Sequence, residues 1–479
     1  MATLRLDALG PAAAALLRLA VAAGATDALL VGGAVRDAGL GRIRRDGLDI
    51  DLAVPRGALP MARRIAERGR GTLVPLDDER GAARIVLGAT RIDIADFRAP
   101  TLEGDLAARD FTVNALAVPV RALVREGRAA IVDPTGGLAD LRARRLRLPD
   151  PSVLADDPLR GLRGVRLEAT LGLRLVPTTA RAIKAAAPRL TTVAAERVRD
   201  EVLELLAQSQ SARALRRADE LGLLTIILPE IEPMRVTTQP APHRFPVLEH
   251  SLRAVAGADQ VVARPGDLTP FGEELGTHLA APLAGGVTRG QALKLAALLH
   301  DVAKPETRRA IGGRVRFFEH DLIGAARVRD IGERLRLPAA VTGLVERLVR
   351  HHLRPMHLAA APTVTSRARY RFYRDLGPDT RDLLLLVLVD AAAVRGEAPR
   401  RAWRRATLVR DLLAGWSEQQ EVASAAPLLR GDDVMRHFDL TPGPEVGRLL
   451  RRAREAQDLG RVSTRDEALA YLDSSRRRS

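Results

Sequence analysis

Two aspartates separated by one residue, Asp49 and Asp51, are the side chains in this sequence best suited to metal-assisted chemistry. They lie in the run Asp49-Ile-Asp-Leu-Ala-Val54, which predicts a strand, and side chains at i and i+2 of a strand point to the same face. Paired carboxylates on one face can hold one or two divalent cations, which phosphoryl-transfer enzymes use. The pair therefore predicts a metal-dependent phosphoryl-transfer site.

A glycine pair, Gly32-Gly33, stands upstream of the aspartates, between an apolar run at 29–31 and a helix expected at 34–40. Glycine lets the backbone approach a ligand closely, and the start of a helix attracts phosphate. Arg36 would lie in the first turn of that helix. Together with the carboxylates, this arrangement indicates a site for a nucleoside triphosphate and hence a nucleotidyltransferase.

Five segments combine such polar groups with apolar runs: Leu30-Val-Gly-Gly-Ala-Val-Arg-Asp37, Asp49-Ile-Asp-Leu52, Arg109-Asp-Phe-Thr-Val-Asn-Ala115, Asp133-Pro-Thr-Gly-Gly-Leu-Ala-Asp-Leu141 and Asp156-Asp-Pro-Leu-Arg-Gly-Leu-Arg163. In letters, order and spacing the chain resembles class II tRNA nucleotidyltransferases (the CCA-adding enzymes) and the related bacterial poly(A) polymerases. It departs from the family pattern at Ala108, where an arginine is common, and at Asp156, where a glutamate is usual.

The resemblance implies template-independent addition of C and A nucleotides from CTP and ATP to the 3′ end of tRNA. Asp49 and Asp51 would hold Mg²⁺ ions that bridge the triphosphate and the attacking 3′-hydroxyl of the RNA. Asp93, in Arg91-Ile-Asp-Ile94, is a candidate third carboxylate, and an ordinary strand residue is the alternative for it. The resemblance also implies a set of nucleotide-binding residues: Gly32, Gly33, Arg36, Asp37, Arg109, Asp110, Asn114, Asp157, Arg160, Arg163 and Arg166.

Asp157-Pro-Leu-Arg160 reads as a helix start, with Asp157 at the N-cap and Pro158 at the first helical position. A purely local reading would pair Arg160 with Asp157. The resemblance instead makes these two residues the reader of the nucleobase. Cytosine and adenine both present an exocyclic amine beside an acceptor ring nitrogen. A carboxylate and an arginine would therefore admit C and A and reject U and G.

A second group of residues, His250, His300-Asp301 and Asp390, follows the H…HD…D order of the HD metal-dependent phosphohydrolases, which the second half of the chain resembles. His320 and the pair His351-His352 add further matches. Imidazole and carboxylate ligands suit a transition metal or Mg²⁺, and the sequence does not choose among them. We expect a metal site here and a phosphohydrolase activity.

The composition bounds the rest. The net charge is +16, which favours a polyanionic partner, although the arginine content also fits a GC-rich genome. Aromatic residues make up only 3% of the chain, so recognition of RNA by shape and backbone charge is expected rather than base stacking. The chain has no cysteine, which excludes disulfide-linked partners. No signal peptide or membrane span is evident, and a cytoplasmic location is expected.

The fold class expected is α+β: a small mixed α/β, polymerase β-like nucleotidyltransferase head followed by helical parts. Strands are predicted at 29–31, 49–54, 84–87 and 91–94, with helices at 34–40 and 58–69. The domains predicted are a head (1–140), a helical neck with base-reading and RNA-binding elements (141–235), an HD domain (236–395) and a helical tail (396–479).

Several alternatives stay open on the sequence alone. A poly(A) polymerase shares the head, but residues 55–90 hold no convincing basic element of the kind that its subgroup carries. Enzymes that add only A, or only CC, can carry the same short motifs. A metal-dependent phosphohydrolase with a non-catalytic head is a candidate of another class. The presence of Asp49, Asp51, Asp157 and Arg160 argues against it, and likewise against a pure RNA-binding scaffold.

Overall fold

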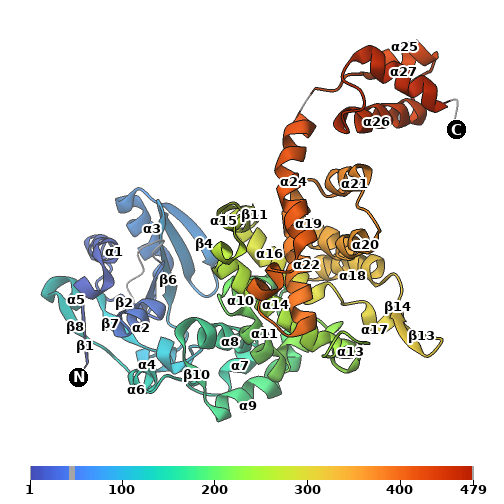
Figure 1. Ribbon diagram of the computed structural model, residues 1–479. Coiled ribbons are helices and arrows are strands. Elements are labelled where there is room, and N and C mark those ends of the chain that lie inside the picture. The colour runs from blue at the N-terminus through green and yellow to red at the C-terminus, as the bar shows by residue number, and fades with distance from the viewer. Residues whose placement is uncertain (1, 42–48, 425, 477–479) are drawn as a thin grey trace. The chain divides into compact units, whose positions relative to one another are not determined.

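The structure is a computed structural model of the 479-residue chain and describes residues 2–41, 49–424 and 426–476. The chain divides into two compact units, each of which is treated by itself (Figure 1). The first unit is Met1–Gln208 with Ala214–Ile227, and the second is Ser209–Arg213 with Leu228–Ser479.

A six-stranded mixed sheet forms the centre of the first unit, in the order β4-β5-β6-β3-β2-β7. Strand β3 pairs in parallel with β6 and antiparallel with β2, while β5 lies antiparallel to both β4 and β6. Helix α3 packs against β5 and β6. The strands are β1 (Thr3–Arg5), β2 (Leu29–Val31), β3 (Asp49–Val54), β4 (Thr72–Asp77), β5 (Ala82–Leu87), β6 (Thr90–Asp96), β7 (Ala117–Pro119), β8 (Arg128–Ala130), β9 (Arg145–Leu146) and β10 (Arg174–Leu175).

The helices of this unit lie around the sheet and then continue the chain beyond it. Helix α3 is amphipathic, and its apolar residues Met61, Ala62 and Ile65 are buried. The helices are α1 (Pro11–Ala22), α2 (Gly33–Gly39), α3 (Ala58–Gly69), α4 (Leu102–Ala107), α5 (Val120–Glu126), α6 (Gly137–Arg142), α7 (Val153–Asp156), α8 (Arg160–Leu171), α9 (Pro177–Ala186), α10 (Ala195–Ala207), α11 (Ser211–Glu220, whose first three residues belong to the second unit) and α12 (Leu223–Ile227).

The second unit is largely helical. Helix α16 is buried along almost its whole length because α14, α19 and α22 pack around it. The helices are α13 (Ile231–Val236), α14 (Val247–Ala263), α15 (Gly272–Ala280), α16 (Arg289–Leu299), α17 (Lys304–Thr307), α18 (His320–Arg334), α19 (Ala339–His351), α20 (Arg354–Ala360), α21 (Ser366–Leu376), α22 (Thr380–Arg395), α23 (Pro399–Trp403), α24 (Thr407–Ser424), α25 (Gly431–Phe438), α26 (Pro444–Asp458) and α27 (Arg465–Arg476). The last three helices enclose a small core of their own, which includes Val434, Leu449 and Leu472.

The expected fold class is confirmed: a mixed α/β head precedes a largely helical body. The helical parts are interrupted by short two-stranded ribbons that the sequence analysis did not predict, among them β11 (Pro282–Ala284) with β12 (Val287–Thr288) and β13 (Arg308–Ile311) with β14 (Arg314–Phe317). The four-domain division is finer than the two compact units and stays a prediction. In the described part of the chain, every helix is too short or too polar to cross a lipid bilayer.

Candidate active sites

The strand register brings the carboxylates of the head together. In the parallel pair β3–β6, Asp51 lies opposite Asp93, and Asp49 precedes Asp51 by two residues on the same strand. Both oxygens of Asp93 accept hydrogen bonds from Arg84, at 2.8 and 2.7 Å. Burial raises the pKa of Asp51, and the negative charge of Asp93 raises it further. Carboxylates that repel one another in this way form a site that a divalent cation would stabilise.

Gly32 makes the close approach between the glycine turn and this carboxylate possible. Its φ is 72°, and a Cβ at this position would lie 3.0 Å from Oδ2 of Asp51. A side chain would therefore be strained by the backbone and would also press on a proposed metal ligand. Helix α2 begins at the next residue, Gly33, which lines the same cavity as Asp51, so the N-terminal end of the helix lies at this site. The turn expected from the sequence is present.

A cavity of about 940 Å³ joins these groups to the proposed base reader. Such a volume suits a ligand of nucleotide size. Both signs of charge occur in its wall, with carboxylates and guanidinium groups supplied by the sheet, by the segment after α4 and by α8. The predicted residues that line it are Gly32, Gly33, Asp51, Asp93, Arg109, Asp110, Asn114, Asp157, Arg160 and Arg163.

Arg36 and Asp37 lie differently from the expectation. The Arg36 side chain is buried and bound within the protein, since its Nε donates to Asp37 at 2.8 Å and its Nη1 donates to Oδ1 of Asn114 at 2.6 Å. Both residues line an adjoining cavity of about 270 Å³, together with Asp49, and they do not line the larger one. In this arrangement Arg36 is held by Asp37 and Asn114, and its contact with a nucleotide phosphate stays a prediction.

Arg166 also lies differently from the expectation. Its Nε donates to Glu201 at 2.7 Å, and it does not line the larger cavity. Glu201 comes from α10, 35 residues further along the chain, which is why the three-residue steps Arg160, Arg163, Arg166 did not reveal this partner. Arg166 therefore ties α8 to α10.

The start of α8 lies later than predicted, because the helix begins at Arg160 and Leu159 is its N-cap. Asp157 follows α7 in an extended conformation, and its Oδ1 accepts a hydrogen bond from the amide of Leu159 at 3.3 Å. Its other oxygen pairs with Arg197 at 2.7 Å, while Arg160 donates to the carbonyl of Arg109 at 3.4 Å. The local Asp157–Arg160 pair is therefore absent, and both side chains line the cavity.

Asp110 connects the nucleotide pocket to α8. It accepts hydrogen bonds from Nδ2 of Asn114 at 3.0 Å and from the amide of Phe111 at 2.8 Å, and it pairs with Arg163 at 3.3 Å. Burial alone would raise the pKa of Asp110, but the charge of Arg163 and these hydrogen bonds lower it below its ordinary value. Asp110 thus stays ionised and holds both Asn114 and Arg163 in place.

The histidine cluster of the second unit gathers residues from separate helices. His250 lies in the first turn of α14, and Asp390 lies within α22. Nε2 of His250 is 3.2 Å from Nε2 of His300 and 3.0 Å from Oδ1 of Asp390. These three side chains form one candidate metal-binding group.

A second group shares the same cluster and consists of Asp301, His320 and His352. Nε2 of His320 and Nε2 of His352 lie 3.3 Å apart, and both are within 3.8 Å of Oδ1 of Asp301. The other oxygen of Asp301 lies 3.2 Å from Nε2 of His300, so Asp301 stands between the two groups. The ligand set predicted from the sequence lacked His320 and His352, although both had been noted as further matches.

The imidazole rings are oriented by the backbone. Nδ1 of His300, of His320 and of His352 each lies within hydrogen-bonding distance of the carbonyl three residues earlier, at 3.0, 2.8 and 2.6 Å. A ring that donates from Nδ1 to a carbonyl keeps Nε2 free to bind a metal. Because all three rings share this arrangement, their Nε2 atoms converge on the carboxylates.

The charges of the cluster fit a divalent cation. Burial opposes a charge on His300, but Asp301 and Asp390 raise its pKa to about 10, whereas burial lowers the pKa of His352 to about 4. Both oxygens of Asp301 are buried and accept no well-formed hydrogen bond from the described residues, although Lys304 Nζ lies 2.7 Å from Oδ2. At neutral pH the proton on His300 thus offsets the charge of Asp301 and Asp390, and a divalent cation bound by the carboxylates and imidazoles would take the place of that proton.

Fold and sites together define the class of protein. The mixed sheet with paired carboxylates beside a glycine turn is the arrangement of a nucleotidyltransferase head, and the helical body carries a candidate metal site with the H…HD…D order of residues. Family comparisons agree: residues 28–147 match the poly A polymerase head domain, residues 172–235 match the probable RNA and SrmB-binding site of polymerase A, and residues 247–393 match the HD domain.

The chain belongs to the family of class II tRNA nucleotidyltransferases and poly(A) polymerases. It is 39% identical to an A-adding tRNA nucleotidyltransferase of Deinococcus radiodurans over 93% of this chain and 94% of that protein. A CC-adding tRNA nucleotidyltransferase of Thermus thermophilus is 37% identical over 93% of each chain. In fold, the chain is similar to a CCA-adding enzyme solved as a complex with ATP, with a TM-score of 0.66, 20% identity and 99% coverage of both chains.

Proposed function

We propose that this chain adds C and A nucleotides to the 3′ end of tRNA without a template and so completes the CCA end. One observation carries the proposal: the cavity that contains Asp51 and Asp93 also contains Asp157 and Arg160. The groups for phosphoryl transfer and the groups for choosing a base therefore share one space. A head that served only as an RNA-binding scaffold would need neither set.

The head residues have separate parts in this mechanism. Mg²⁺ held by Asp49 and Asp51 would supply charge stabilisation to the triphosphate and the departing pyrophosphate. The N–H groups at the start of α2 and the guanidinium of Arg109 would hold the phosphates. Asp93 is proposed as the third carboxylate, on the strength of its position opposite Asp51. Arg36 would keep Asn114 in position for the nucleotide sugar.

Base selection is proposed to lie with Asp157 and Arg160. Asp157 would accept a hydrogen bond from the exocyclic amine of C or A, and Arg160 would donate one to the adjacent ring nitrogen. U and G present a carbonyl where C and A present the amine, so the Asp157 carboxylate would face an acceptor and lose its hydrogen bond. The pairing of Asp157 with Arg197 supports this role, because it fixes the carboxylate from the side.

Incorporation assays test the proposal. Purified protein would be incubated with Mg²⁺ and labelled CTP or ATP, with tRNA lacking CCA, tRNA lacking only the final A, or oligo(A). Two C additions followed by one A addition are expected. Long A tails on any RNA would identify a poly(A) polymerase instead. No incorporation, with intact phosphate release, would support a phosphohydrolase with a non-catalytic head.

A restricted specificity is the second candidate, and the relatives favour it. The proteins that match at 39% and 37% identity are named A-adding and CC-adding enzymes, whereas a multifunctional CCA protein of Azoarcus is 30% identical over 67% of this chain. The same assay separates the candidates. An A-adding enzyme would use ATP only with tRNA ending in CC, and a CC-adding enzyme would stop after two C nucleotides.

For the histidine cluster we propose a metal-dependent hydrolysis of phosphate esters at RNA 3′ ends. In a 2′,3′-cyclic phosphate, the oxygen of water would bond to phosphorus, one phosphorus–ribose oxygen bond would break, and the released ribose oxygen would take a proton. Lys304, whose Nζ lies beside Asp301, would offset the charge of the phosphate. Conversion of adenosine 2′,3′-cyclic phosphate to adenosine 2′- or 3′-monophosphate with Mn²⁺, Ni²⁺ or Mg²⁺ tests it, and inertness with every metal would refute it.

A further inference from the structure

The hairpin β13–β14 has a sequence that packing does not explain. Gly312 and Gly313 form its turn, both with positive φ, and the hairpin extends from the helical body (Figure 1). Most of its residues are exposed, and Ile311 keeps 54% of its surface in solvent. A two-stranded ribbon without a packed face is only marginally stable. Something other than the core of this unit must account for its side chains.

Arginines are concentrated on this hairpin. In its register Arg309 lies opposite Arg316 and Ile311 lies opposite Arg314, so three of the four arginines share one face. Like charges in directly opposite positions destabilise a ribbon. Among the described residues, no carboxylate lies within ion-pair distance of Arg308, Arg309, Arg314 or Arg316. The neighbouring Glu306 is occupied by Arg327, at 2.9 Å.

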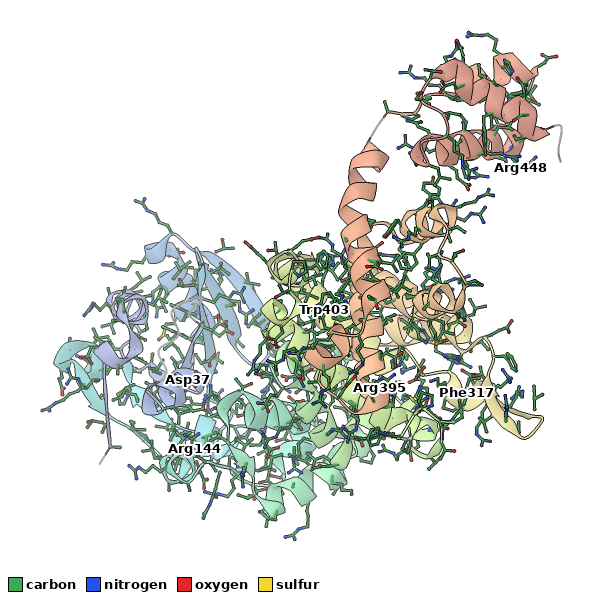
Figure 2. The ribbon with its side chains drawn as sticks, in the orientation of Figure 1. Asp37, Arg144, Phe317, Arg395, Trp403 and Arg448 are labelled. Carbon is green, nitrogen blue, oxygen red and sulfur yellow. The ribbon has the colours of Figure 1, made fainter. Side chains whose placement is uncertain are left out.

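The base of the hairpin is joined to the histidine cluster. The carbonyl of Phe317, the last residue of β14, lies 2.8 Å from Nδ1 of His320 and so orients this candidate metal ligand. The Phe317 ring lies 5.5 Å from Nζ of Lys304, which in turn contacts Asp301. Figure 2 labels Phe317 where the hairpin leaves the helices. A ligand bound to the base of the hairpin would thus lie close to His320 and Lys304.

We propose that the β13–β14 hairpin binds the phosphate backbone of an RNA strand whose 3′ end enters the histidine cluster. The inference rests on the proposed hydrolase function and deepens it, because it makes the substrate a polynucleotide end rather than a free nucleotide. Alternate residues of a strand are about 7 Å apart, so Arg314 and Arg316 present a row of separate positive charges to a regularly charged chain. Phe318, 53% exposed beside them, offers a face for one base.

Kinetics on two substrates test the proposal. The triple variant Arg309→Ala/Arg314→Ala/Arg316→Ala is compared with wild type on an oligoribonucleotide of about 12 nucleotides ending in a 2′,3′-cyclic phosphate and on adenosine 2′,3′-cyclic phosphate. KM for the oligonucleotide should rise about tenfold or more. The slope of log KM against the logarithm of the salt concentration should fall by about 2, because three arginine contacts to phosphate are lost. KM for the mononucleotide and both kcat values should stay within about twofold, because no metal ligand is changed.

A control variant removes the same charge elsewhere in the second unit. Arg264, Arg400 and Arg404 are exposed, and the triple Arg264→Ala/Arg400→Ala/Arg404→Ala should leave both KM values as in wild type. An equal rise in KM, or an equal fall in kcat, for both substrates in the hairpin variant would mean that the hairpin only supports the structure of the metal site. An unchanged oligonucleotide KM would overturn the proposal.

A binding test separates this inference from the proposed hydrolysis. The chain has no cysteine, so Arg314→Cys can be labelled at a single position with a photo-crosslinker. Crosslinks to the last nucleotides of the oligoribonucleotide are expected, and an acidic polypeptide such as polyglutamate should not compete at equal charge. Crosslinks without hydrolysis would refute the hydrolase but support the RNA-binding hairpin. No crosslinks, or full competition by polyglutamate, would refute the hairpin proposal.

Discussion

The two candidate metal sites of this chain are built in opposite ways. The head site uses carboxylates on adjacent strands, in the wall of a cavity of about 940 Å³, and Asp49 is exposed to solvent. The site in the second unit uses four histidines and two aspartates, and all of them except Asp390 are buried. The first site leaves room for a large ligand, whereas the second holds its own donor atoms within reach of one another.

The difference indicates when each metal is bound. Oxygen ligands in a wet cavity suit Mg²⁺, which keeps part of its hydration shell and binds together with substrate phosphates. Clustered imidazoles with fixed rings suit a transition metal that stays bound between turnovers. We therefore expect the head metal to arrive with the nucleotide, and the metal of the histidine cluster to be part of the folded protein.

The largest effect should follow from changing the head alone. Asp51→Asn removes a proposed metal ligand and should lower the rate of nucleotide addition by about 10³-fold or more. Hydrolysis at the histidine cluster should be unchanged, and incorporation of labelled nucleotide is the measurement. Asp27→Asn, at an exposed position of the same unit, is the control and should retain full addition. Loss of both activities in Asp51→Asn would contradict the proposal that the two sites work independently.

The reciprocal change concerns Asp301, which stands between the two histidine groups. Asp301→Asn should remove tightly bound metal and lower the rate of hydrolysis by roughly 10²-fold or more. The rate of nucleotide addition should not change. Metal content after gel filtration is the measurement. His352→Ala should remove metal from only one of the two groups. If both variants kept the metal content of wild type, the cluster would not be a resident metal site.

Within the head cavity, two arginines of the same helix give a sharper comparison. Arg160→Ala should reduce discrimination of C and A against U and G by about tenfold, because one base hydrogen bond is lost. Arg166→Ala is the matched control, since Arg166 is bound to Glu201 outside the cavity. The measurement is kcat/KM for each of the four nucleotides. Equal selectivity in the two variants would remove Arg160 from base reading.

The smallest effect concerns Asp110, whose folded pKa is lowered. A carboxylate whose pKa is lower in the folded than in the unfolded state stabilises the fold at any pH above its pKa in the unfolded state. This stabilisation is lost as the pH falls through the pKa of the folded state. Asp110→Asn should therefore lower the free energy of unfolding by about 1–3 kcal/mol at pH 7. The difference in this free energy between the variant and wild type should shrink below about pH 4. Thermal melts across pH measure it. A difference that does not change with pH would indicate that packing, not charge, is responsible.

The sequence was sufficient for the parts of the sites that depend on local spacing. Alternation along β3 predicted that Asp49 and Asp51 share a face, and the family resemblance supplied Asp157 and Arg160. The contact that holds Arg36 could not be foreseen because its partner Asn114 lies 78 residues away, and no local pattern reveals such a pair. His320 and His352 were left out of the ligand set for the same reason: they lie 32 residues apart in sequence, and only the packing of α18 on α19 joins them.

The parallel register of β3 and β6 determines where this chain can change its length during evolution. Asp93 lies beside Asp51 only because six successive residue pairs run in step from Asp49–Arg91 to Val54–Asp96. Inserting or deleting one residue in β6 would turn every following side chain to the opposite face of the sheet. The turn at Gly312-Gly313 carries no such constraint. Insertions should therefore accumulate among relatives at the hairpin tip, whereas β6 should keep a constant length.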